Sequence, residues 1–188
     1  MARPRSDDRQ GAIMAAATRV IAAQGLGAPT ATIAREAGVS NGSLFTYFAT
    51  KADLLNRLYV ELKEEMAAAA LVGLPTESDI RTQLLHMWSH WLRWARSCPE
   101  KRRALAHLLV SDEITSESHQ TASDALAGIR KLLERSREHG PMRDAPLEFV
   151  VTLMSALADA TIDFMIHDPV NADKHCLAAF EALWRMIA

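Results

Sequence analysis

Residues 40–51 bring together side chains whose types and spacing suit contact with double-stranded DNA. In their sequence, SNGSLFTYFATK, Asn41 carries a carboxamide that can pair bidentately with adenine in the major groove. Ser43 offers a hydroxyl to a base or a phosphate, and Phe45 offers an apolar ring to a thymine methyl group. Gly42 lets the backbone approach closely. These residue types therefore suit the reading of base edges.

Two short helices are needed to position these side chains. The first is expected from about Thr30 to Ala37, with an apolar face at helical spacing. Gly38 can end it in a left-handed backbone conformation, and Ser40 can cap the next helix, roughly Asn41 to Phe48. A helix, a short turn containing glycine and a second helix with a hydrogen-bonding outer face are typical of the helix-turn-helix motif.

Several groups of residues at fixed spacing carry a resemblance to a known family. They are Ile33-Ala34, Ala37-Gly38-Val39-Ser40, Gly42-Ser43-Leu44-Phe45, Tyr47-Phe48 and Lys51-Ala52-Asp53-Leu54-Leu55. Together they resemble the DNA-binding signature of the TetR (tetracycline repressor) family of transcriptional regulators, over about the first quarter of the chain. The resemblance implies a DNA-binding homodimer whose second domain encloses a small-molecule effector.

The resemblance also implies which residues contact DNA. They are Thr30, Ala31, Ser40, Asn41, Gly42, Ser43, Phe45, Tyr47 and Lys51. Thr30, Tyr47 and Lys51 match family positions that contact the phosphate backbone, which orients a protein without reading sequence. Ala31 falls where some relatives carry a long polar side chain that reaches a base, and Phe45 replaces the more usual tyrosine. Base reading is therefore expected to depend mainly on the second helix.

Each of these residues also has an ordinary structural alternative. Asn41 could cap a helix, Phe45 and Tyr47 could lie in the core, and Lys51 could be a solvated charge in a first helical turn. One such role is reasonable for any one residue. Together, however, these structural roles do not explain why Phe45, Tyr47 and Lys51 all lie outside the apolar stripe of the helices. We therefore favour the DNA-binding interpretation.

Composition and charge favour an all-α protein with two parts. The formal net charge is −2, but residues 1–51 hold six basic and three acidic side chains, a net charge of +3. The remaining residues hold 15 basic and 20 acidic side chains, a net charge of −5. We therefore expect a three-helix DNA-binding domain at 1–51 and a larger helical effector-binding and dimerisation domain at 52–188, with about nine helices in all.

The first helix is expected from Asp7 or Asp8 to Ala23 or Gln24. It should pack against and support the two helices of the helix-turn-helix motif, called the reading pair below. The residues before it, MARPRS, should form a disordered arm. Arg3 and Arg5 could enter a minor groove beside the main contact. A solvated tail without a specific role explains the same composition.

The middle of the chain supplies candidates for an effector pocket. Thr50 is expected to cap a helix that runs to about Val72, and another helix should span about Ser78 or Asp79 to Ser97. The residues expected to line a pocket are Met66, Trp88, Trp91 and Met154. A tryptophan row at helical spacing can also simply form a core stripe. His86 and His90, four residues apart, could chelate a metal, but no third ligand is evident, so no metal site is expected.

The last two helices have the pattern of an oligomer interface. After helices at about 99–110 and 116–138, Asp144 should cap a helix from Leu147 to His167 that is apolar on more than one side, and a terminal helix follows Asp168-Pro169. The expected interface residues are Phe149, Leu153, Leu157, Phe164, Phe180, Leu183 and Trp184. Asp159 and Asp163 could be read as paired catalytic carboxylates, but polar-face or contact residues are the better interpretation.

These patterns predict a ligand-responsive, homodimeric DNA-binding transcriptional regulator, most simply a repressor, acting on a near-palindromic operator in double-stranded DNA. The effector should be small and apolar or amphipathic, and no cofactor is expected. The alternatives are an architectural DNA binder without an effector and a small helical enzyme. For an enzyme, the sequence shows no nucleophile–base pair, glycine-rich phosphate loop or metal-ligand set. Without a leader or a membrane-spanning stretch of about 18 apolar residues, a cytoplasmic protein is expected.

Overall fold

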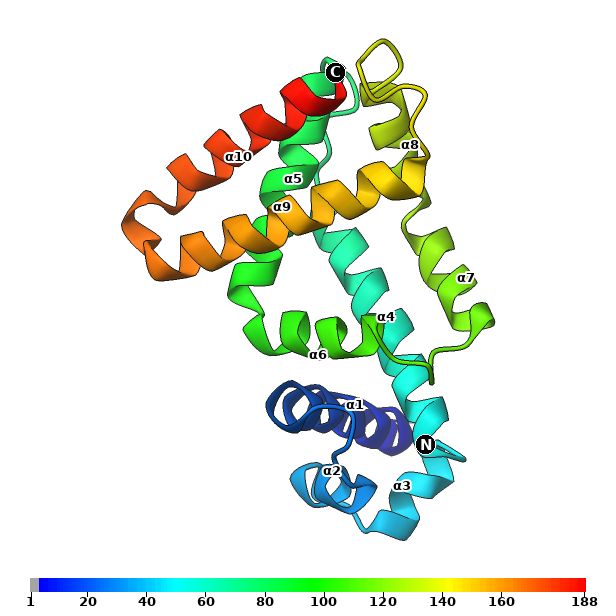
Figure 1. Cartoon of the computed structure of the whole chain (residues 1–188). Helices are drawn as coiled ribbons and strands as arrows, with labels where there is room; N and C mark the ends of the chain where they lie inside the picture. The colour runs from blue at the N-terminus through cyan, green and yellow to red at the C-terminus, as the bar shows by residue number, and fades with distance from the viewer. Residues whose placement is uncertain (1–3) are drawn as a thin grey trace. The chain divides into compact units, whose positions relative to one another are not determined.

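The structure, a computed structural model, describes residues 4–188 of the chain and the side chains of residues 8–188. Within this range all regular elements are helical, with ten α-helices and one short 3-10 helix (Figure 1). The predicted all-α class is confirmed. The count exceeds the expected nine because the single helix predicted over 116–138 is interrupted at Leu126.

The helices divide into two compact units. The first comprises the residues up to Glu64 together with Cys98–Asp124, and the second comprises Glu65–Ser97 with Ala125–Ala188. Helix α4 (Lys51–Leu71) passes from the first unit into the second. Because these units are defined by compactness and not by function, the boundary expected after residue 51 stays a prediction.

The first unit holds the helix-turn-helix pair. It contains α1 (Pro4–Gln24), α2 (Thr30–Glu36), α3 (Asn41–Tyr47), the first part of α4, α6 (Pro99–Leu109) and nearly all of α7 (Ser116–Ala125). In this unit α1 packs against both α6 and α2, and α2 packs against α3. Its core consists of fully buried aliphatic side chains, among them Ile13, Ile21, Ile33, Leu44, Leu54 and Leu58.

The expected start of the first helix is wrong. The helix begins at Pro4, and not at Asp7 or Asp8, so residues 4–6 are helical where a disordered arm was expected. A proline suits such a first helical position because its missing N–H has no partner there. Arg3 and the side chain of Arg5 lie outside the described part of the structure, so their minor-groove role stays a prediction.

Local signals set the boundaries of α2, α3 and α4. Gly38 has a φ of +69°, the left-handed backbone that ends α2 without the clash a side chain would bring. The Ser40 hydroxyl accepts a hydrogen bond from the Ser43 backbone N–H at 3.1 Å and so caps α3. At α4, Thr50 and Asp53 accept hydrogen bonds from each other's backbone N–H at 3.0 and 2.9 Å. All three predicted features are confirmed.

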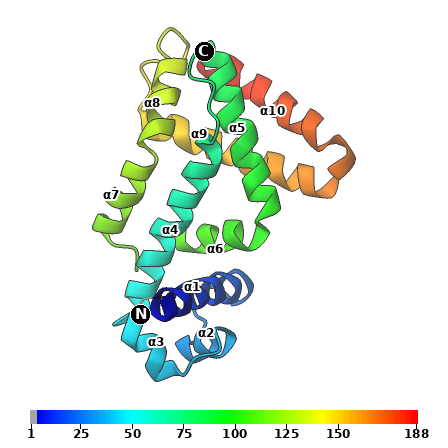
Figure 2. The same ribbon diagram turned by 180° about the vertical axis from the view of Figure 1, so that it is seen from behind.

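The second unit is built around α5 (Ile80–Ser97). It also contains α8 (Ala127–Ser136), α9 (Leu147–His167), the 3-10 helix η1 (Pro169–Asn171) and α10 (Ala172–Ile187). Helices α9 and α10 lie side by side in both views, and each also contacts α5 (Figures 1 and 2). The capping role expected of Asp144 is wrong, because α9 starts directly after Pro146 without a side-chain cap.

Helix α9 corrects one further expectation. By length and composition alone, Leu147–His167 is apolar enough to cross a membrane, although no such stretch was expected. The core helix of a soluble protein passes the same test. In this chain α9 packs against α5 and α10, and only a third of its most apolar window is buried. Much of the apolar surface of α9 is therefore not covered within the second unit.

Candidate nucleic-acid interface

The outer face of α3 is accessible to a ligand, as the sequence predicts. Asn41 is exposed, and the ring of Phe45, one helical turn later, is 40% exposed. Tyr47 is half-buried, while Leu44 on the opposite face is fully buried in the first unit. The four-residue spacing places Asn41 and Phe45 on one side of the helix. The alternative interpretation, in which Phe45 lies in the core, is therefore wrong.

The hydroxyl groups of this helix differ in what they can still bind. Ser40 is occupied as the helix cap, and the Thr46 hydroxyl donates to the Gly42 carbonyl at 3.2 Å. The side chains of Asn41 and Ser43 have no intramolecular hydrogen-bond partner among the described residues. The polar groups available to DNA on α3 are therefore the Asn41 carboxamide and the Ser43 hydroxyl, with the Tyr47 hydroxyl toward the helix end.

Helix α2 presents the other two candidate residues. Ala31 is exposed and Thr30 is half-buried at the start of the helix. Pro29 occupies the N-cap position, so no side chain caps this helix. The methyl group of Ala31 cannot hydrogen-bond a base, and the expectation that α3 carries most of the base reading stays a prediction.

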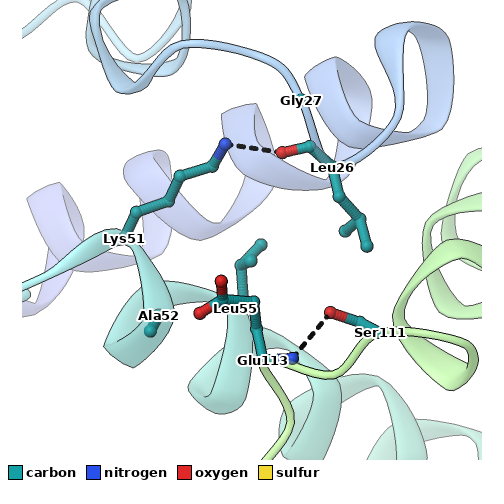
Figure 3. Close-up of a pocket in the computed structure, with 7 residues that line it drawn as sticks. All are labelled: Leu26, Gly27, Lys51, Ala52, Leu55, Ser111 and Glu113. Carbon is teal, nitrogen blue, oxygen red and sulfur yellow. Dashed lines mark hydrogen bonds between the residues drawn. The ribbon is translucent and has the colours of Figure 1, made fainter.

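Lys51 has a partner that sequence reasoning missed. Its ammonium donates a hydrogen bond to the backbone carbonyl of Leu26 at 2.5 Å (Figure 3). The two residues line a pocket of about 330 Å³ between the α1–α2 link, the start of α4 and the α6–α7 link, together with Gly27, Ala52, Leu55, Ser111 and Glu113. Twenty-five residues separate Lys51 from Leu26, so no local pattern could have revealed the contact. An ammonium has three donors, so two remain for a phosphate.

Two arginines near the helix-turn-helix pair differ in whether they form an ion pair. Arg19 forms an ion pair with Glu36 at 2.9 Å, on the surface between α1 and α2. Arg35, in the last turn of α2, is exposed. A surface ion pair of this kind contributes little stability, but it neutralises one positive charge of the DNA-binding segment.

The second unit holds the residues expected to line an effector pocket. Trp88 is fully buried, and its indole N–H donates to the Cys176 carbonyl of α10 at 3.1 Å. Met66 and Met154 are also buried, whereas Trp91 is half-buried and meets Trp88 edge to face at 5.9 Å between ring centroids. Trp88 is thus a core residue that fixes α5 to α10. The assignment of these four residues to a pocket stays a prediction.

The expected interface residues fall into three groups. Phe149 and Phe164 of α9 are 52% and 65% exposed, and Leu153, Leu157 and Trp184 are half-buried. Phe180 and Leu183 are fully buried within the second unit, so within this protomer they support α10 and offer a partner no surface. The sequence pattern also places Leu177 of the terminal helix in the interface, and this residue is 50% exposed. Sequence reasoning missed Ile166, which is 45% exposed. Its apolar type, in a helix that is apolar on more than one side, was the signal that could have identified it.

The histidine pair on α5 is stacked. The rings of His86 and His90 lie 4.0 Å apart between centroids, and His86 Nε2 lies 2.8 Å from the Val72 carbonyl oxygen. Burial lowers the pKa of His90, and the neighbouring positive charges of His86 and Arg93 lower it further. Among the described residues, no group of three histidine, cysteine or acidic side chains could hold a metal ion. Asp159 and Asp163 are exposed on α9.

Comparison with known proteins adds a family relationship to this geometry. Residues 13–58 match the family described as "Bacterial regulatory proteins, tetR family". A solved structure assigned to the TetR family of transcription regulators, from Shewanella sp. PV-4, is similar over 94% of this chain and 96% of its own, with 27% sequence identity and a TM-score of 0.83.

Two further solved structures share the fold and contain small molecules. The transcriptional regulator FadR from Bacillus subtilis, in complex with stearoyl-CoA, is similar over 95% of this chain and 99% of its own, with 18% identity and a TM-score of 0.70. The TetR-like regulator LfrR from Mycobacterium smegmatis, in complex with proflavine, is similar over 96% and 98%, with 20% identity and a TM-score of 0.69. At these identities the likeness establishes the fold alone.

Proposed function

The chain belongs to the TetR family of bacterial regulatory proteins, and from this premise we propose that it is a homodimeric transcriptional repressor released from its operator by a small molecule. The observation that carries the DNA-binding part is the accessible outer face of α3. On it Asn41 and Phe45 lie one turn apart on a helix fixed by the Ser40 cap and the buried Leu44.

Contacts to DNA are proposed to divide between reading and positioning. Asn41, Ser43 and Phe45 would face base edges, while Thr30, Tyr47 and Lys51 would contact phosphates. Ser40 and Ala31 flank this surface, and Gly42 lets the backbone approach closely. Because phosphate contacts carry no sequence information, the two groups should differ in their effect on specific and random DNA.

A homodimer is proposed from the apolar surface of α9 and α10. Among the described residues, these two helices leave four large apolar side chains about half exposed or more: Phe149, Phe164, Ile166 and Leu177. Two helices from each of two chains can pack as a four-helix bundle about a two-fold axis, which buries such surfaces. A two-fold dimer presents its reading helices about one turn of DNA apart, so the operator should be close to palindromic.

Release by a small molecule is proposed from the family and from α4. FadR and LfrR each bind an apolar or amphipathic molecule, stearoyl-CoA and proflavine. In this chain α4 begins three residues after α3 and ends in the second unit, where Met66 is buried. An effector that favours one position of α4 would shift the population of DNA-binding molecules. A coupling of about 1–3 kcal/mol changes operator affinity roughly 5- to 150-fold.

The test is to select DNA from random duplexes with the purified protein, and then to screen small molecules for release. The proposed function predicts an enriched, near-palindromic sequence bound by dimers, and at least one apolar or amphipathic molecule that lowers the affinity. Sequence-specific binding that no molecule in a broad screen weakens would favour an architectural DNA binder. No enrichment at all would reject the DNA-binding role.

A further inference from the structure

We propose that α3 reads A·T base pairs, with Asn41 contacting an adenine and Phe45 contacting a thymine about two base pairs away. The proposal rests on the proposed function, because it names the class of base that the reading helix selects. Within the part of the chain that the structure describes, hydrogen bonding and exposure together determine which side chains of α3 are available.

Two polar side chains of α3 and its cap are already engaged. The Ser40 hydroxyl accepts from the Ser43 N–H, and the Thr46 hydroxyl donates to the Gly42 carbonyl. The Asn41 carboxamide is exposed and has both a donor and an acceptor free. An adenine presents the N7 acceptor and the N6 donor in the major groove, which is the complementary pair. Asn41 is therefore the bidentate reader of this helix.

The apolar reader is Phe45. Its ring is 40% exposed on the same side of α3 as Asn41, and Phe lacks the hydroxyl through which tyrosine could bond a phosphate. In the major groove a thymine is distinguished by its methyl group, which an apolar side chain can contact. An exposed ring on this face therefore favours a thymine.

Helix α3 has no side chain of the kind that usually contacts guanine. Guanine is most often read by a bidentate arginine or lysine, and α3, Asn41–Tyr47, contains neither. In the neighbouring elements, Arg19 is paired with Glu36 and the Lys51 ammonium donates to Leu26. Arg35 is exposed in the last turn of α2, in the helix-turn-helix pair itself, and a guanine contact from it would contradict the proposal.

The spacing of the two readers sets the spacing of the two bases. Four residues of α-helix span about 6 Å along the helix axis, since each residue rises about 1.5 Å. Successive base pairs are about 3.4 Å apart along the axis of the duplex. Asn41 and Phe45 should thus contact base pairs about two steps apart within one half-site.

The experiment compares DNA selection from random duplexes by the wild-type chain and by three variants, Asn41→Ala, Phe45→Ala and Arg35→Ala. Thr46→Ala serves as a matched control on α3, because its hydroxyl is committed to Gly42. Thermal unfolding of each variant checks that the fold is retained. Asn41→Ala should lose preference at one A·T pair per half-site, by roughly 5- to 150-fold. Phe45→Ala should lose preference at an A·T pair about two steps away.

A second measurement tests the atoms involved. Replacing thymine by uracil at the Phe45-dependent position removes one methyl group and should weaken wild-type binding by about fourfold, while Phe45→Ala should not distinguish the two bases. A G·C pair at the Asn41-dependent position, or a guanine preference that only Arg35→Ala abolishes, would overturn the proposal while leaving sequence-specific binding intact. Failure to select any sequence would instead reject the proposed function.

Discussion

The Lys51 ammonium donates a hydrogen bond to the Leu26 carbonyl at 2.5 Å, and this contact joins the first turn of α4 to the link between α1 and α2. It places the amine beside the reading pair before any DNA is bound. A lysine held by one of its three donors can still present the other two to a phosphate. Lys51 can therefore both brace the first unit and position it on the DNA backbone.

Removing this amine should weaken DNA binding without changing sequence preference. Lys51→Ala is expected to lose similar affinity on operator and random DNA, and to reduce the slope of log affinity against log salt by about one. Anisotropy titrations at several salt concentrations measure both quantities. Lys131→Ala, on the exposed side of α8, is the matched control. An unchanged salt slope for Lys51→Ala would show that its amine stays on Leu26 and does not reach a phosphate.

The hydrogen bond that caps α3 should contribute to the stability of the folded chain. Ser40→Ala removes the acceptor of the Ser43 N–H and should lower the free energy of unfolding by about 1 kcal/mol. Ser40→Asp keeps an acceptor at this position and should restore most of the stability in denaturant titrations. Equal stability of Ser40→Ala and the wild-type chain would mean that the cap contributes nothing to α3.

The proposed dimer depends on apolar side chains that the chain itself leaves exposed. Phe164→Glu, on α9, should place a charge in the interface and convert the dimer into a monomer with much weaker operator binding. Light scattering after size-exclusion chromatography measures the mass directly. Val72 lies in the second unit but outside α9 and α10, and it is 61% exposed. Val72→Glu adds the same charge there and should leave the dimer intact. A Phe164→Glu protein that remains dimeric would locate the interface elsewhere.

The lowered pKa of His90 predicts a dependence of stability on pH. The unfolded chain titrates near the ordinary value of 6.5 and takes up a proton before the folded chain does. Stability contributed by neutral His90 is therefore present above about pH 6.5 and is lost as the pH falls below it. His90→Gln should flatten the decline of the thermal midpoint between about pH 6.5 and pH 5. A decline as steep as that of the wild-type chain would assign it to other groups.

Sequence patterns predicted the reading pair well because its signals are local. Gly38, the Ser40 cap and the Thr50 cap each act within three or four residues, and the structure confirms all of them. The start of α1 differs from the prediction because a proline suits the first turn of a helix as well as an irregular arm, so the composition of residues 1–6 does not decide between them.

Features that depend on distant contacts could not be derived in this way. The Lys51–Leu26 contact joins residues far apart in sequence. The interruption at Leu126 comes two residues before Gly128, where an added Cβ would lie 3.0 Å from a side-chain carbon of Leu71, a residue far away in the sequence. In α9 and α10, apolar residues occur on several sides, so periodicity alone could not separate the exposed Phe164 from the fully buried Phe180.

The most direct measurement is the ratio of affinities for the selected operator and for a scrambled duplex of the same composition, at one salt concentration, for the wild-type chain and for Asn41→Ala. If α3 reads bases, the wild-type ratio should reach about a thousand or more, and Asn41→Ala should lower it mainly by weakening operator binding. Gln24→Ala, which truncates an exposed carboxamide at the end of α1, should leave the ratio unchanged. A wild-type ratio near one, or an equal loss on both duplexes for Asn41→Ala, would contradict this account.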